Sequence, residues 1–293
     1  MNPTFHFAWI GETALSDGGA ALRREIAEAD RCRPYAALLH SGNLLRGNNP
    51  RRISMALLQD ELAAFRGSVS SGVLLPALGR HDGYRSERYA GQLCCDMMTE
   101  ALWAEQTVYL EAFPGLRRAP NKPYYYMDFH DARVRVVVLC SYFFQMDEQA
   151  ELFARYTGID IPQLRWLREE ALPSPPDYTL LLLSHVMPNT RFETGHDPFI
   201  YNRRSTEPLL AVLQEPLRRG NPVVWLAGGY GDAAVSSAVA PGVSLDSTDS
   251  GGVLLLPHRM TCGDTPRLTD GCLDAAGHTL TLRTDGCETL YRF

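Results

Sequence analysis

The sequence contains almost no lysine. Of its 28 basic residues, Lys122 is the single lysine and the others are arginines. This arginine usage indicates a GC-rich genome of bacterial type, and the arginines are scattered singly or in pairs such as Arg23–Arg24 and Arg203–Arg204. The formal net charge is -6 and the pI is about 5.8. Nucleic acids and anionic membranes attract basic surfaces, which this composition does not indicate. We therefore expect neither a nucleic-acid partner nor a membrane partner.

The sequence also lacks long apolar runs, a first segment like a signal peptide, and C-x-x-C motifs. No stretch reaches the ~20 apolar residues of a membrane span. The first residues, "MNPTFHFAWIGE", lack the basic start and the small-residue cleavage site of a signal peptide. The seven cysteines include no C-x-x-C spacing, which argues against a cysteine zinc site and favours reduced thiols. We expect a cytoplasmic protein.

What the sequence does contain is a series of short apolar runs. With 293 residues, 45% of them hydrophobic, the chain can bury a large core. Runs of four to eight mostly apolar residues are typical of strands that are covered on both faces. Six segments each contain such a run together with the small or polar residues that end it: 5–11, 35–43, 71–79, 134–141, 178–185 and 221–229.

Helical patterns lie between several of these runs and predict a layered α/β fold. Apolar residues recur at helical spacing in four segments, 18–31, 52–67, 160–172 and 205–220. The last forty residues read instead as strands joined by turns, and we expect them to complete an outer sheet. We expect one domain over 1–293, in which the irregular region 83–125 is an insertion over one end of the sheet.

Polar residues follow the strands at the end where α/β sheets bind ligands. These strand ends read "IGETA", "HSGNLLRG", "LGRHDG", "LLSHVMP" and "LAGGYGDA". Their order and spacing resemble the metallophosphoesterase superfamily, also called the calcineurin-like phosphoesterases. That family carries D-x-H, G-D-x-x-D, G-N-H-D/E, a lone His and G-H-x-H at five successive strand ends. The resemblance covers nearly the whole chain and implies a four-layer α/β/β/α sandwich of two mixed sheets.

The resemblance also implies a chemistry in which two metal ions bind a phosphate ester and activate a water. Most of the family's metal ligands are replaced in this chain. The replaced or altered positions are Glu12, Ala14, Asn43, Arg46, Arg80, Gly229 and Gly231, and His185 alone keeps a plain ligand type. The pair His81–Asp82 matches the family's proton donor and the carboxylate that orients it.

The replacements remove the charge and the donor atoms that a dinuclear centre needs. Glu12 is the one anion left among the ligand positions, while Ala14, Gly229 and Gly231 offer no donor atom. Arg80 cannot coordinate, because its guanidinium stays protonated. At about 5 Å from a dication it costs roughly 6–7 kcal/mol with an effective dielectric near 20. We therefore expect no metal cofactor, and Arg80 replaces the metal as the positive charge of the site.

The sequence predicts a pseudophosphatase, a binding or scaffolding protein for a small anion or a protein partner. Arg46 and Arg80 are the candidate anion-binding residues. The alternative is a phosphoric ester hydrolase with a mononuclear or metal-free centre, in which His81 is the acid and Asp82 orients it. If active, it would use Mn, Fe or Zn.

Several residues have a structural interpretation beside a functional one. His81–Asp82 can simply fix its loop, and His185 can hydrogen-bond within its own. His196 and Asp197 in "TGHDP" are candidates for a substitute metal ligand. A metal-free hydrolase needs a nucleophile, and the nearby hydroxyl residues have no obvious base beside them in sequence: Thr13, Ser41 and Ser184.

Overall fold

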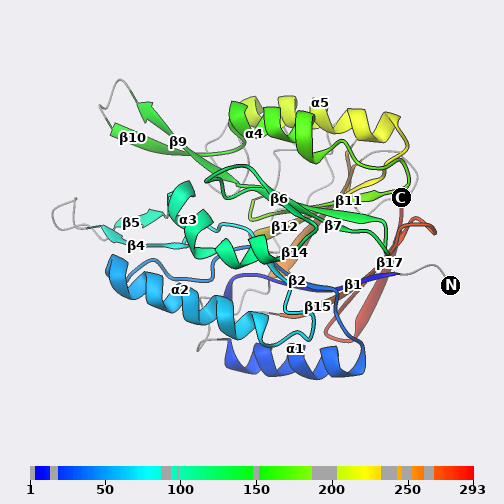
Figure 1. Ribbon diagram of the computed structural model, residues 1–293, viewed down its shortest axis with the longest axis horizontal. Helices are drawn as coiled ribbons and strands as arrows, with labels where there is room; N and C mark the ends of the chain where they lie inside the picture. Colours follow the sequence, from blue (N-terminus) through cyan, green and yellow to red (C-terminus); the bar gives the residue numbers. More distant parts are fainter. Residues whose placement is uncertain are drawn as a thin grey trace.

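The computed structural model describes residues 4–13, 19–86, 94–97, 99–147, 152–186, 203–231, 243–245, 253–260 and 267–293. Within these ranges two sheets pack face to face, and helices cover their outer faces (Figure 1). In the view of Figure 1, α1 and α2 lie below the sheets and α4 and α5 lie above them. The predicted sandwich of two mixed sheets is confirmed.

The first sheet has six strands in the order β17-β16-β15-β1-β2-β3. Strands β1, β2 and β3 run parallel, and β15, β16 and β17 add to them as an antiparallel meander. The strand bounds are Phe5–Ile10, Ala37–His40, Leu74–Pro76, Thr269–Asp274, Thr279–Thr284 and Cys287–Arg292 for β1, β2, β3, β15, β16 and β17.

The second sheet has seven strands in the order β13-β14-β12-β11-β8-β7-β6. Its centre is parallel, from β13 to β8, and β7 and β6 extend it antiparallel. The bounds are Leu116–Arg118, Tyr125–Phe129, Val134–Val138, Thr179–Ser184, Val223–Gly231, Val243–Leu245 and Val253–Met260 for β6, β7, β8, β11, β12, β13 and β14.

The apolar runs become strands because both of their faces are covered. In β11, Leu181 and Leu183 join the cluster between the sheets, whereas Leu180 and Leu182 pack on the helix side. All four leucines are fully buried, which explains a run without polar alternation.

Helices α1, α2 and α5 begin and end close to predicted segments, α4 covers only the first part of 160–172, and α3 lies where no helix was predicted. The helix bounds are α1 (Ala20–Cys32), α2 (Arg51–Arg66), α3 (Glu100–Gln106), α4 (Ile161–Trp166) and α5 (Arg203–Arg218). Asp160 caps α4, because its side chain accepts the Gln163 N–H at 2.8 Å. The segment 160–172 is not one regular helix, since α4 continues as the π-helical turn η3 (Leu167–Ala171). No helix in the described ranges has the length and apolarity needed to cross a membrane.

The prediction for the chain's last forty residues is wrong in one respect. β14 does not join an outer sheet but pairs with β12 inside the seven-stranded sheet. Among the described strands, β15, β16 and β17 form the outer part of the other sheet. The run of β14 is apolar on both faces, as a central strand requires, and Leu254 and Leu255 lie in different clusters.

The region 83–125 contains the hairpin of β4 (Gly83–Ser86) and β5 (Cys94–Met97), the helices α3 and η2 (Val108–Ala112), and the edge strand β6. The β4–β5 hairpin and the hairpin of β9 (Tyr142–Asp147) and β10 (Leu152–Thr157) extend from the same side of the molecule (Figure 1). That the region is an insertion stays a prediction.

Candidate functional site

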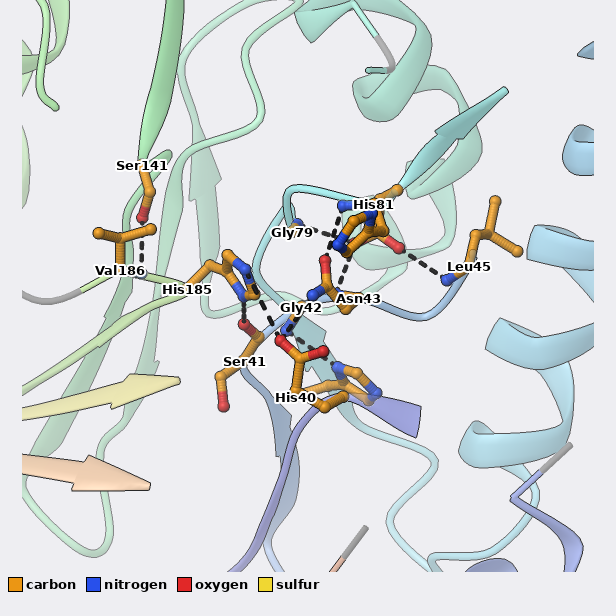
Figure 2. A network of polar contacts seen from close by, with 12 residues as sticks. His40, Ser41, Gly42, Asn43, Leu45, Gly79, His81, Ser141, His185 and Val186 are labelled. Atoms are coloured by element: carbon orange, nitrogen blue, oxygen red, sulfur yellow. Dashed lines mark hydrogen bonds and ion pairs between the residues drawn. The ribbon is translucent and has the colours of Figure 1, made fainter. Parts of the chain in front are cut away.

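Four predicted residues meet where β1, β2, β3 and β11 end. Glu12 follows β1, Asn43 follows β2, Asp82 follows β3 and His185 follows β11. Strands that run parallel end at one edge of a sheet, and the two sheets place their edges together. We call Glu12, Asn43, Asp82 and His185 the strand-end network, part of which is labelled in Figure 2. All four residues are buried.

Asn43 is held by hydrogen bonds at both ends of its side chain. Its Nδ2 donates to Glu12 Oε1 at 2.5 Å, and its Oδ1 accepts the His81 N–H at 2.8 Å. Asn43 and Glu12 both have left-handed backbones, with φ 60° and 56°. Asparagine adopts this conformation more readily than most residues, whereas glutamate is strained there. Both groups of the Asn43 amide are therefore committed within the protein.

Asp82 binds the backbone of two loops. It is fully buried, and its Oδ2 accepts the N–H groups of Asn43 at 3.0 Å and Gly79 at 2.8 Å. Its Oδ1 accepts the Leu45 N–H at 2.9 Å. Burial raises the pKa of Asp82 to about 6, although these backbone donors act in the opposite direction. The carboxylate joins the loop after β2 to the loop after β3.

The same two loops are in close contact at Gly79. A Cβ at this position would lie 2.0 Å from the Asn43 backbone nitrogen and 2.5 Å from Asn43 Oδ1. No side chain fits there, so glycine is required by the packing of the loops.

His185 has a fixed orientation and tautomer. A carbonyl oxygen can only accept, so the 2.7 Å contact between His185 Nδ1 and the Ser41 carbonyl places a proton on Nδ1. The other ring nitrogen, Nε2, lies 3.8 Å from Glu12 Oε1. The ring thus spans from the loop after β2 to the carboxyl group that follows β1 (Figure 2 shows His185 beside Ser41).

The buried environment of the Glu12 carboxyl group disfavours its ionised form. Burial raises its pKa to about 7; the Asn43 hydrogen bond lowers it, and the negative charge of Asp82 raises it further. The group therefore changes protonation near neutral pH.

His40 is a member of the site that the sequence reasoning did not identify. It is fully buried, and its Nδ1 accepts the Gly42 N–H at 3.0 Å. The proton is therefore on Nε2, which donates to Thr13 Oγ1 at 3.0 Å. In this tautomer His40 is not a base for Thr13. Its place as the last residue of β2, next to "SGN", was the available signal.

The two candidate serine nucleophiles are also committed to structural hydrogen bonds. Ser41 Oγ accepts from Trp9 Nε1 and donates to the Ile10 carbonyl, both at 3.0 Å. Ser184 Oγ accepts from Trp225 Nε1 and donates to the Val186 carbonyl, both at 2.8 Å.

The strand-end network as defined above does not include the other predicted residues. Arg46 and His81 are exposed and Arg80 is half-buried. Gly229 and Gly231 lie in the last part of β12. The remaining candidates lie outside the described residues: Ala14, His196 and Asp197.

No cluster of three or more His, Cys, Asp or Glu side chains that could hold a metal ion occurs within the described ranges. The network supplies one imidazole and one carboxylate to a common space, namely His185 and Glu12. Two divalent ions need several anionic ligands, so these residues do not fit a dinuclear centre.

Comparison with solved structures identifies the fold. The chain is similar to a dimetal phosphatase from Danio rerio, with a TM-score of 0.64 and 14% sequence identity over 99% of both chains. A vacuolar protein sorting 29 structure from Cryptosporidium parvum matches 98% of this chain and 95% of that chain at 11% identity, with a TM-score of 0.32 that carries no weight. No family model matches the chain, and no curated protein does. The described architecture is that of a metallophosphoesterase-like fold.

Proposed function

We propose that this chain is a non-catalytic member of the metallophosphoesterase superfamily that has lost the dinuclear metal site and serves as a binding or scaffolding protein. The observation that carries the proposal is the Asn43 side chain. At the position of the family's bridging carboxylate, it donates to Glu12 and accepts from His81. A bridging ligand needs oxygen atoms that face the metals, whereas this amide already has two protein partners.

The charges support the same conclusion. The carboxylate of Asp82 is occupied by backbone N–H groups, whereas Glu12 Oε1 lies 3.8 Å from His185 Nε2. With its pKa raised to about 7, even Glu12 is partly neutral at physiological pH. A site with one partly ionised carboxyl group attracts a pair of dications weakly.

The bound partner that we propose is a small anion held by Arg46 and Arg80. Arg46 follows Leu45 and Arg80 follows Gly79, and Asp82 binds the backbone N–H groups of both preceding residues, which supports a shared role for the two arginines. Guanidinium groups recognise phosphate and carboxylate in a bidentate manner.

Anion binding can be tested by calorimetric titration with inorganic phosphate and pyrophosphate. The double variant Arg46→Gln, Arg80→Gln is expected to lose at least tenfold in affinity. The matched control is Arg31→Gln, since Arg31 is a surface residue of α1 whose Nε donates to the Ala27 carbonyl. Equal binding by the double variant and the wild type would contradict a role for these arginines.

A second candidate function is supported by the orientation of His185. A metal-binding histidine donates its other ring N–H to a carbonyl or carboxylate, as His185 Nδ1 does to Ser41. This observation favours a hydrolase with a single metal ion near Glu12 and His185, in which His81 is the acid.

The two candidates differ in metal content and turnover. Elemental analysis of the purified protein, together with an assay of bis-p-nitrophenyl phosphate, separates them. We expect no stoichiometric Mn, Fe or Zn and no turnover. One metal ion per chain with turnover that His185→Ala and His81→Ala both abolish would establish the hydrolase instead.

A further inference from the structure

Strand β17 is an open edge of the six-stranded sheet. It pairs with β16 on one side, and no described strand pairs with it on the other. All of its residues are exposed except Tyr291, which is half-buried. The opposite edge of the same sheet, β3, is buried along its length. Exposed edges present unpaired N–H and C=O groups to other strands.

The hydrogen-bond pattern fixes which residues of β17 point outward. Phe293 N donates to the His278 carbonyl at 3.1 Å, and the hairpin turn Asp285–Gly286 has φ 51° and 76°, as in a two-residue type I′ turn. Pairs that bond to each other alternate along an antiparallel ladder. Residues 287, 289 and 291 therefore bond to β16, while the N–H and C=O groups of Glu288, Leu290 and Arg292 point away from the sheet.

These three outward residues are self-complementary. If two copies of β17 pair antiparallel about a two-fold axis at Leu290, then Leu290 faces Leu290 and Glu288 faces Arg292 on both sides of the axis. In this register each outward N–H of one copy faces an outward C=O of the other copy, and the reverse. The three residue pairs exchange two hydrogen bonds each, about six in total. The Leu290 side chain is 52% exposed and would be covered by its symmetry mate.

We propose that β17 is a dimerisation strand, through which two copies of this chain join their six-stranded sheets edge to edge. Charge complementarity argues for a second copy as the occupant, because the sequence E-T-L-Y-R places opposite charges at equal distances from Leu290. Glu288 also contacts Arg283 on β16, and its second carboxylate oxygen serves the partner's Arg292. One strand pair buries less than the ~800 Å² per partner of a stable complex, so the dimer dissociates on dilution.

The test is sedimentation velocity over a concentration series from about 1 to 300 μM, a range chosen for weak interfaces. We expect wild type to shift from the monomer mass of 32.6 kDa to twice this mass. Arg292→Glu places Glu288 opposite a second glutamate and should weaken the dimer at least tenfold. The double variant Glu288→Arg, Arg292→Glu restores opposite charges and should recover it.

A backbone variant tests the register independently of charge. Leu290→Pro removes an outward N–H that does not bond to β16, and proline is tolerated at such edge positions. It should abolish the dimer while the circular dichroism spectrum stays that of wild type. A wild type that stays monomeric at 300 μM, or a dimer that Leu290→Pro or Arg292→Glu leaves intact, overturns the proposal.

Discussion

The two sheets bring different residues to their shared edge. The six-stranded sheet contributes Glu12, Asn43 and Asp82, which form hydrogen bonds with one another or with nearby backbone. The seven-stranded sheet contributes His185 after β11, and Gly229 and Gly231 lie in the last part of its strand β12. The polar residues that follow the strands of the first sheet thus hold its loops together, whereas the second sheet adds one side chain, His185, to the strand-end network.

The difference indicates which residues hold the loops at this edge of the sandwich in place. Asp82 stabilises two loops through their N–H groups, and Gly79 allows those loops to touch. Both roles are structural. We therefore expect substitutions on the first sheet's loops to affect stability, with effects that decrease in the order given below.

The largest effect is expected from Asp82→Ala. The substitution leaves the N–H groups of Asn43, Leu45 and Gly79 buried without their acceptor, at a cost of about 4 kcal/mol in the free energy of unfolding. Chemical denaturation measures this loss. The control Asp177→Ala removes an exposed carboxylate that pairs with Arg133 and should cost less than about 1 kcal/mol. Equal costs would show that the Asp82 contacts contribute little.

Gly79→Ala is expected to cost about 3 kcal/mol, because the added methyl group overlaps the Asn43 backbone. The matched control is Gly67→Ala at the end of α2, where the backbone is helical, with φ -69°, and the nearest atom lies at 3.4 Å. That control should be close to neutral. A stable Gly79→Ala protein would mean that the loops after β2 and β3 can separate freely.

Stability should fall as pH rises through neutrality. The folded-state pKa of Glu12, about 7, lies above the ordinary glutamate value of 4.5, so the folded state binds more protons between these values. Its contribution is full below about pH 4.5 and is lost as pH passes 7, by about 3 kcal/mol in total. Asp82 acts in the same direction, with its pKa raised to about 6.

Denaturation at pH 5 and pH 8 measures this dependence. Glu12→Gln keeps an acceptor for Asn43 Nδ2 but cannot ionise, so the variant should flatten the profile. An unchanged profile would assign the pH dependence to other groups.

The smallest effect is expected from His81→Ala. The backbone N–H of His81, rather than its exposed imidazole, bonds to Asn43, so the free energy of unfolding should change by less than about 0.5 kcal/mol. A loss of several kcal/mol would show that the His81 side chain also joins these loops.

The sequence predicted those features of the structure that depend on residues close to one another along the chain. Apolar runs such as that of β11 predicted buried strands, and the strand-end residues Glu12, Asn43, Asp82 and His185 do lie together. The sheet to which β14 belongs depends on long-range pairing with β12, which no local pattern records. The role of His40 depends on a tautomer set by the Gly42 N–H, and the partners of Asn43 depend on two left-handed backbones.

The central claim is that the retained side chains cannot hold a pair of divalent cations. Isothermal titration of the wild type with Mn²⁺ at pH 7.5 tests it directly. It is compared with the single variant Arg80→Asn and a sixfold variant that restores Glu12→Asp, Ala14→His, Asn43→Asp, Arg80→Asn, Gly229→His and Gly231→His. We predict no binding by the wild type or by Arg80→Asn, and recovery only in the sixfold variant, because metal ligands act as a set. Two equivalents of Mn²⁺ bound tightly by the wild type, or by Arg80→Asn alone, would contradict the claim.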